Sequence, residues 1–526
     1  MIQAQGSSKM SNKRINYKNY QMRNHLLAAA FMAVAIFSFG QSFNGYALYN
    51  LQNQNTAYLI DKDGNIAHSW SCAASCNYTV LLKSNGNIVR GGVYSGNQLN
   101  GAAVGGMVQE IAPSGAVVWE YVYSNSNHCS HHDITLLDNG NVILTAWEVK
   151  TSSECTQAGV ANPATQQWPT HFIELEPDGN GSAAIVWEWH MFDHLIQDYD
   201  ASKDNYGVVS DHPELMDANL LSVSGGGGPG PGGGYDWFHV NGVDYNPDLD
   251  QLVFSSRFTS EFYIIDHSTT TAEAASHSGG NSGMGGDFIF RWGNPSNYGG
   301  TGSQTIAAAV HDPRWIEDDG RPNGGYIQFF NNAGGTGGSS VVDAIDAPES
   351  GWLYTMTGNI YGPANYDWRH ECIASSTGQS SQNRMSNGNT FVNVSNQYMY
   401  EVDANDNLVW QYNAGPTKAF RYECDHPGII ALLGEDPCGL LSLEDKNLER
   451  VNFYPNPSNT GIFSIDGANT TDQDVKITVV NMLGAVVLEV ENEQSIDLSQ
   501  MPDGIYSAIL NFGDKRIITK KLTLVR

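Results

Sequence analysis

A strand phrase that recurs through the middle of the chain constrains its fold more than any other feature. Each copy reads as an apolar strand, a turn with Asp or Gly, and a second strand near a tryptophan, as in YLIDKDGNIAHSW and VQEIAPSGAVVWEY. Propellers are built from such sheet repeats around a channel. We therefore predict an all-β chain whose residues 43–440 form a six-bladed β-propeller. The six marker residues are Trp70, Trp119, Trp187, Trp292, Trp368 and Trp410.

A second phrase, an apolar strand with an Asn-Gly turn, accompanies several of these copies. It appears as LLKSNGNIV, ITLLDNGNVIL and RMSNGNTFV, and Asn-Gly between apolar runs is a strong hairpin signal. With 56 glycines and only 15% charged residues, the composition also favours short strands and turns. The early strand GYALYN is available to complete the last blade.

The last segment, residues 451–526, has a different character from the repeats. Short alternating strands between turn residues predict a small, immunoglobulin-like β-sandwich. Its phrases YPNP, ITVVNMLGAVV, DLSQMPDGIY and KKLTLVR resemble, in this order, a type IX secretion sorting domain. The resemblance implies export across an outer membrane by the type IX machinery, with a secreted or cell-surface product. A carbohydrate-binding sandwich is the rival interpretation.

The N-terminal residues 1–40 read as an extension and a signal peptide. Arg23 precedes the apolar run LLAAAFMAVAIFSF at 26–39, which is followed by small and polar residues. This run is too short to span a bilayer comfortably, and so we expect no transmembrane segment in the mature chain.

Charge and cysteine content narrow the partners and the compartment. The formal net charge of −29 argues against nucleic acid, which is held by clustered Lys and Arg. The seven cysteines lack zinc-ribbon spacing, and an oxidising compartment permits the local disulfides Cys72–Cys76 and Cys129–Cys155. The Asp-rich turns DKDGN and DANDN are either calcium loops or ordinary blade turns, and we predict turns and no metal.

Three histidines fall where the innermost strand of a blade should begin, and such positions converge on the channel. They are His132, His239 and His311. Strand alternation places Asn241 on the same face as His239. Arg257 lies near the same channel mouth if a hairpin turns at PDLDQ. These residues form the candidate site, with His131 as the alternative to His132.

Two other chemistries could use residues of these types. Three imidazoles and a water form a catalytic zinc site in some enzymes, but Arg257 beside a dication is unfavourable, whereas it suits an anionic substrate. No GxSxG elbow is present, so the nucleophile is more naturally an imidazole than a serine.

The same phrases resemble the arylsulfotransferase family over nearly the whole propeller. They are HHDITLLDNGNV, WHMFDHLIQDYD, DWFHVNGVDYNPDLDQLVFSSR, YIIDHSTTTAEAASHSGG with RWGNP, and YGPANYDW. The resemblance implies transfer of a sulfuryl group from an aryl sulfate to a phenol, without a nucleotide donor or other cofactor. It assigns the nucleophile to His311 and further site positions to His132, His239, Asn241 and Arg257.

The implied chemistry agrees with these residue types. Sulfuryl transfer, like phosphoryl transfer, spreads charge over equatorial oxygens, which Arg257, His239 and Asn241 would hold. His311 would form a sulfohistidine in a ping-pong reaction, with His132 as acid and base. The alternatives are a surface propeller that binds phenolic or sulfated ligands without turnover, and a hydrolase with water as the acceptor.

Overall fold

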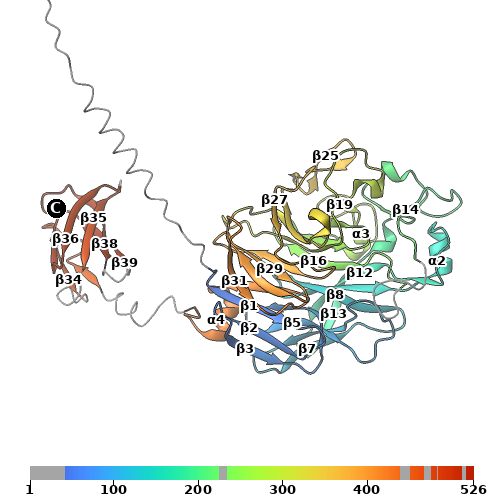
Figure 1. Ribbon diagram of the computed structural model, residues 1–526, viewed down its shortest axis with the longest axis horizontal. Coiled ribbons are helices and arrows are strands. Elements are labelled where there is room, and N and C mark those ends of the chain that lie inside the picture. Colours follow the sequence, from blue (N-terminus) through green and yellow to red (C-terminus); the bar gives the residue numbers. More distant parts are fainter. Residues whose placement is uncertain (1–41, 224–233, 439–450, 467–474, 483, 512–516) are drawn as a thin grey trace, which may run out of the picture.

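A computed structural model describes residues 42–223, 234–438, 451–466, 475–482, 484–511 and 517–526 (Figure 1). The predicted signal peptide at 1–40 lies outside the described residues. No helix in the described part of the chain is long and apolar enough to cross a membrane.

Six four-stranded antiparallel sheets make up the larger part of the described chain (Figure 1). Each sheet is given from its innermost to its outermost strand, and the first two are β4 (Cys76–Leu82), β5 (Ile88–Val93), β6 (Gly106–Ile111) and β7 (Val117–Val122), and β8 (His128–Leu136), β9 (Val142–Glu148), β12 (Thr170–Pro177) and β13 (Ala183–His190). The next two are β16 (Val240–Asn246), β17 (Gln251–Ser256), β18 (Glu261–Asp266) and β19 (Phe288–Trp292), and β20 (Val310–Trp315), β21 (Ile327–Asn331), β22 (Val341–Ile345) and β27 (Trp368–Glu371). The last two are β28 (Ser381–Arg384), β29 (Thr390–Val394), β30 (Tyr398–Val402) and β31 (Leu408–Tyr412), and β32 (Ala419–Glu423), β1 (Gly45–Asn50), β2 (Thr56–Ile60) and β3 (Ile66–Ser71).

The innermost strands close into a ring. Neighbours pack in the order β4, β8, β16, β20, β28 and β32, and β32 returns to β4. In the last sheet β32 pairs with β1, so the strand GYALYN joins the two ends of the ring, as expected. The chain is therefore a six-bladed β-propeller, and the predicted fold class is confirmed.

The repeat tryptophans hold the same place in every blade. Each of the six lies in the outermost strand of its sheet, namely β3, β7, β13, β19, β27 or β31. The Asn-Gly phrases form the β4–β5, β8–β9 and β28–β29 hairpins, which join innermost strands to their neighbours. In the turns DKDGN and DANDN, Asp61 and Asp403 accept hydrogen bonds from main-chain N–H groups of their own turns.

Short elements lie between the propeller strands. They are β10 (Lys150–Thr151), α2 (Ser152–Gln157), β11 (Gln166–Gln167), η1 (Met191–Asp193), β14 (Leu195–Ile196), η2 (Val209–Asp211), β15 (Met216–Asp217), α3 (Thr271–Ala274), η3 (Pro295–Tyr298), η4 (Thr336–Gly338), β23 (Glu349–Ser350), β24 (Leu353–Tyr354), β25 (Met356–Thr357), β26 (Ile360–Tyr361) and α4 (Pro427–Leu433).

The C-terminal segment is a sandwich of two antiparallel sheets. One contains β33 (Asn452–Tyr454), β34 (Ile462–Asp466) and β37 (Ser495–Asp497), and the other β36 (Val486–Glu491), β35 (Lys476–Asn481), β38 (Gly504–Asn511) and β39 (Ile517–Leu524). Phe463 from the first sheet and Val479 and Leu510 from the second share one buried core. This is the small β-sandwich that the sequence predicts.

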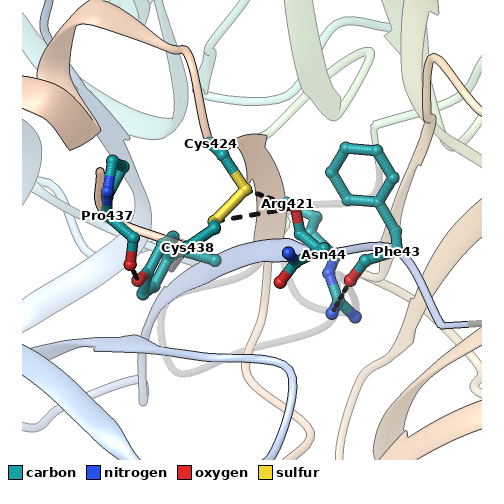
Figure 2. The surroundings of a disulfide bond; sticks show 7 residues. Phe43, Asn44, Arg421, Cys424, Pro437 and Cys438 are labelled. Carbon is teal, nitrogen blue, oxygen red and sulfur yellow. Dashed lines mark hydrogen bonds between the residues drawn. A yellow bond between two sulfur atoms is a disulfide. The ribbon is translucent and has the colours of Figure 1, made fainter. Parts of the chain in front are cut away.

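One disulfide is present among the seven cysteines, but it is not one of the predicted pairs. Cys424 bonds to Cys438, whereas Cys72, Cys76, Cys129 and Cys155 are free and buried. The predicted pairing fails because Cys129 and Cys155 pack in different apolar clusters. Figure 2 shows the disulfide beside Asn44, at the edge of the strand pair that closes the ring.

Candidate active site

The candidate site lies at the beginnings of the innermost strands β16 and β20 and in the middle of β8, and at these places all three strands depart from regular pairing. The register shifts between Ser130 and Ile134 in β8, between Val240 and Gly242 in β16, and between His311 and Arg314 in β20. Irregularities of this kind re-aim side chains and recur beside active sites. They place His131, His132, Asn241 and His311 at the same end of the ring.

The backbone at these positions is held in an uncommon conformation. His132, His239 and Asp312 have φ angles of 49°, 50° and 50°, in the left-handed region that non-glycine residues seldom adopt. Such conformations persist only where the surrounding structure enforces them, and they cluster at functional sites.

The imidazole of His311 is fixed by its own main chain. Its Nδ1 lies 2.9 Å from the carbonyl oxygen of Ala309, so Nδ1 carries the proton and donates it. The side chain is buried, and this burial, with the nearby charge of Arg257, holds the pKa of His311 well below its ordinary value. The ring is therefore neutral at neutral pH, with a lone pair on Nε2.

Arg257 and His311 meet at Gly378. A methyl group at residue 378 would lie 3.1 Å from Arg257 Nη1 and 3.7 Å from His311 Cε1, so the glycine leaves the space between them open. Arg257 follows β17 and donates through Nη1 to the carbonyl of Thr377 at 2.6 Å. The predicted hairpin at PDLDQ joins β16 to β17 and brings Arg257 to this end of the ring.

The two consecutive histidines of β8 lie in different places. The ring of His132 is 4.7 Å from that of His239, centroid to centroid, and contacts the cluster. The ring of His131 instead stacks on Trp147 at 4.0 Å, and its Nδ1 lies 2.7 Å from Nδ1 of His132. Burial lowers the pKa of both, to about 3 for His131. His132 is thus the residue beside His239, with His131 behind it.

His239 is oriented by a buried carboxylate that the sequence analysis did not single out. Its Nδ1 donates to Asp236 Oδ2 at 2.6 Å, and Trp147 Nε1 donates to the other oxygen of Asp236 at 3.1 Å. Burial alone would raise the pKa of Asp236, but the charge and hydrogen bond of His239 overcome this and lower it. An ionised Asp236 leaves Nε2 of His239 as the atom available to a ligand.

Asn241 is already engaged by the protein at both ends of its amide. Its Nδ2 donates to the carbonyl of Val310 at 3.0 Å, and its Oδ1 accepts from the Ser255 hydroxyl at 2.6 Å. The residue is fully buried. These contacts tie β16 to β20 immediately before His311, so Asn241 holds the main chain that carries the imidazole.

A tyrosine that sequence reasoning missed completes the cluster. Tyr78, in β4, is buried, its ring lies 5.1 Å from that of His132, and its hydroxyl has no hydrogen-bond partner among the described residues. Burial, with the carboxylates of Asp133 and Asp312, raises its pKa well above the ordinary value. A neutral phenol beside His132 without a partner of its own is a hydrogen-bond donor for a ligand. No motif around Tyr78 marks it in the sequence.

A buried lysine lies beside the cluster and links the blades. Lys418, the residue before β32, places its Nζ 2.5 Å from Asp133 Oδ2 and 2.6 Å from Asp312 Oδ1. These two carboxylates also accept hydrogen bonds from the hydroxyl of Thr79 and from the main-chain N–H groups of Val243 and Gln382. Thr79, Asp133, Val243, Asp312 and Gln382 come from the five innermost strands other than β32, and Lys418 adjoins β32. We call these six residues the Lys418 hub.

Among the described residues, the site histidines are not part of a set of three or more ligand residues whose ligand atoms all lie within 4.8 Å of one another. In the part of the chain that the structure describes, one set of three ligand residues brings its ligand atoms within 4.8 Å of one another, and it is His194, His277 and Asp287. Both of those histidines already contact the same Asp287 oxygen, at 2.7 and 2.8 Å. The geometry around His311 instead presents a lone pair, an arginine and polar hydrogens, which suits an anion.

These features define a β-propeller with a histidine and arginine anion site at one end of its ring of inner strands. The chain belongs to the arylsulfotransferase (ASST) family, whose model matches residues 9–341. The family supports an aryl sulfotransferase function, with aryl sulfates and phenols as its substrates. Residues 452–525 match a secretion system C-terminal sorting domain, which indicates export to the cell surface or the medium.

Other known proteins resemble this chain only weakly. No curated protein matches the chain. Among solved structures, BamB from Moraxella catarrhalis is 11% identical, with 74% of this chain and 82% of that chain covered and a TM-score of 0.29. A putative 6-phosphogluconolactonase from Bacteroides fragilis is 10% identical over 72% of this chain and 98% of that chain, with a TM-score of 0.36.

Proposed function

We propose that this protein transfers a sulfuryl group from an aryl sulfate to a phenol in two steps, with His311 as the nucleophile that carries the group between them. One observation supports this most directly. The Nδ1 proton of His311 is held by the carbonyl of Ala309, which leaves a neutral Nε2 lone pair beside Arg257. A nucleophile and a cation for the transferred anion are thus in place together.

In the first step, Nε2 of His311 attacks the sulfur of the aryl sulfate. The Nε2–S bond forms as the S–O bond to the aryl group breaks, and the electron pair leaves with the aryl oxygen, which takes up a proton as phenol. The guanidinium of Arg257 and the imidazole of His239, which Asp236 orients, stabilise the negative charge on the three sulfuryl oxygens. Asn241 keeps the main chain before His311 in place.

In the second step, the oxygen of an acceptor phenol attacks the same sulfur, the Nε2–S bond breaks and the imidazole returns to its neutral form. His132 takes the acceptor's proton, because burial keeps it neutral and thus able to act as a base. In the first step the bound anion raises the pKa of His132, which favours proton delivery to the leaving phenolate. Tyr78 is placed to donate its hydroxyl to the aryl oxygen in both steps.

The test is to incubate the purified protein with an aryl sulfate, with and without an added phenol. We expect phenol release to depend on the acceptor after a first turnover, and a peptide containing His311 to gain the mass of one SO3 group. The His311→Asn variant should lose both signals. His212→Asn is the matched control, because the His212 side chain is half-exposed and, among the described residues, its imidazole pairs with Glu214.

The other outcomes separate the competing functions. Sustained phenol release without an acceptor identifies a hydrolase, and no release under either condition identifies a propeller that only binds its ligand. Full turnover by His311→Asn would show that another residue carries the group.

A further inference from the structure

A second polar cavity lies farther along the same inner strands, away from His311. It has a volume of about 190 Å³ and is lined by residues of β20, β21, β28 and β32, among them Arg314, Gln328, Arg384 and Arg421. Arg314 follows His311 by three positions, which is roughly 10 Å along a strand. Asp312 lies between His311 and Arg314 in the chain and forms ion pairs with Arg314 and Lys418. This cavity is therefore separate from the candidate active site.

Arg384 is the residue of this cavity that most clearly indicates a bound anion. Its side chain is 5% exposed and takes part in no ion pair with a described residue. Nε and Nη2 are shielded from solvent and lack hydrogen-bond partners within the described ranges. Its guanidinium lies over the ring of Trp368 at 4.3 Å, and burial lowers its pKa to about 10. A buried cation without an anion is unfavourable, and so the position favours a bound anion.

Two further side chains in the cavity wall present unpartnered polar atoms. Gln328 is fully buried, and neither its amide nitrogen nor its amide oxygen has a partner among the residues described. Nε of Arg314 is likewise unpartnered, although its Nη2 lies 3.3 Å from Asp312. Three side chains of the cavity wall therefore carry N–H groups that have no partner among the described residues.

The other arginines of the wall are already paired. Arg321 lies beside Glu317, Asp319 and Glu423, and Arg421 pairs with Glu401 at 2.9 Å. The unbalanced charge of the cavity is therefore that of Arg384. This local positive charge is notable in a chain of net charge −29, which otherwise repels anions.

We propose that this cavity is a second anion-binding site, which takes a small tetrahedral oxyanion, sulfate or phosphate. Such an anion matches the planar fork of a guanidinium through paired hydrogen bonds. The cavity has the liquid volume of roughly six water molecules, enough for one oxyanion with a few waters. Sulfate would use the donors alone, whereas a protonated phosphate would also donate to the amide oxygen of Gln328.

The experiment measures oxyanion binding to the full exported protein by calorimetry and by the melting temperature, with sulfate, phosphate and chloride at equal ionic strength. Sulfate also suits the site at Arg257, so the wild type is compared with Arg257→Gln and Arg384→Gln. We expect Arg257→Gln to keep a saturable, oxyanion-specific rise in melting temperature. Arg384→Gln should weaken that binding at least tenfold and leave turnover of an aryl sulfate unchanged.

A second variant keeps the test decisive if Arg384→Gln folds poorly. Gln328→Met preserves side-chain length and burial but removes both amide groups, and it should weaken oxyanion binding by several-fold. The comparison of sulfate with phosphate then identifies which anion the site prefers. Equal binding by the wild type, Arg384→Gln and Gln328→Met, or no difference between the oxyanions and chloride in Arg257→Gln, would show that the cavity holds only water.

Discussion

Lys418 Nζ lies 2.6 Å from Oδ1 of Asp312, the residue that follows His311 in the chain. The lysine also pairs with Asp133, which follows His132, so one buried cation holds the main chain next to two of the site histidines. All three charged side chains are about 1% exposed. The Lys418 hub is therefore a structural support for the site as well as a link between the blades.

Replacing this lysine should destabilise the propeller. Lys418→Met removes the cation that pairs with Asp133 and leaves Asp312 with Arg314 alone, and removing one partner of a buried ion pair costs about 3–5 kcal/mol. We expect that decrease in the free energy of unfolding, measured in urea. Lys62→Met is the control, because Lys62 pairs with Asp63 on the surface and should change stability by less than about 1 kcal/mol. Equal effects of the two variants would contradict a supporting role for the hub.

The first half-reaction should stay fast in mildly acidic solution. An exposed histidine has a pKa of about 6.5, whereas burial and Arg257 depress the pKa of His311 in the free protein. Because the neutral imidazole is the nucleophile, its activity is present above the folded pKa and is lost only as the pH falls through that lower value. Phenol release in a single turnover, measured from pH 8 to pH 4, should show no acid limb near 6.5. A limb at 6.5 would mean that an exposed histidine reacts.

Arg257 should contribute to turnover and not only to donor binding. Its guanidinium lies beside His311, where negative charge shifts among the sulfuryl oxygens in the transition state. Removing one such donor typically costs on the order of 10²- to 10³-fold in rate, and we expect this loss in kcat for Arg257→Gln. Arg257→Lys should recover only part of the rate, because an ammonium lacks the planar fork. A change confined to KM would assign Arg257 to ground-state binding alone.

A methyl group at position 378 should block the space between these two residues. In Gly378→Ala the new carbon would lie 3.1 Å from Arg257 Nη1, so the guanidinium must shift or the sulfuryl group must give way. We expect kcat/KM for the aryl sulfate to fall by about 10²-fold, since small misplacements in an active site carry losses of that order. Gly504→Ala, where nothing lies within 4 Å of the new carbon, is the control. Unchanged kcat/KM in Gly378→Ala would place the substrate elsewhere.

The disulfide should stabilise the closure of the ring. Cys424 and Cys438 lie 14 positions apart immediately after β32, and loops of that size correspond to about 3 kcal/mol in the chain-entropy model. Cys438→Ser should lower the free energy of unfolding by this order, and a reducing agent should lower it in the wild type but not in the variant. Cys372→Ser, which removes a free thiol, is the control. Equal sensitivity to reduction in Cys438→Ser would contradict the assignment.

The sequence by itself determined the architecture. Six tryptophans at repeat positions predicted six sheets, and each tryptophan lies in the outermost strand of its sheet. This was predictable because most strands of a blade are consecutive in the sequence, so their alternating residues and turn residues can be recognised along the chain. His239 and His311 fell at the starts of β16 and β20, since that position recurs with the repeat, whereas β8 begins four residues before His132, at His128. The C-terminal β-sandwich could also be predicted from the sequence, because the alternating residues of its core lie within one continuous segment, 451–526.

Only the tertiary structure decided which groups surround those histidines. Tyr78 and Lys418 lie in none of the phrases quoted above, and each reaches its partners from a strand that is distant in the chain. Asp236 and Arg384 do lie in quoted phrases, but nothing in those phrases indicates that Asp236 orients His239 or that Arg384 lacks an ion-pair partner among the described residues. The same is true of the disulfide, where sequence proximity favoured Cys72 with Cys76, whereas the closing of β32 against β1 fixes the edge at which Cys424 meets Cys438. Periodicity specifies the sheets, but burial, charge pairing and side-chain orientation arise only when the six sheets close into a ring.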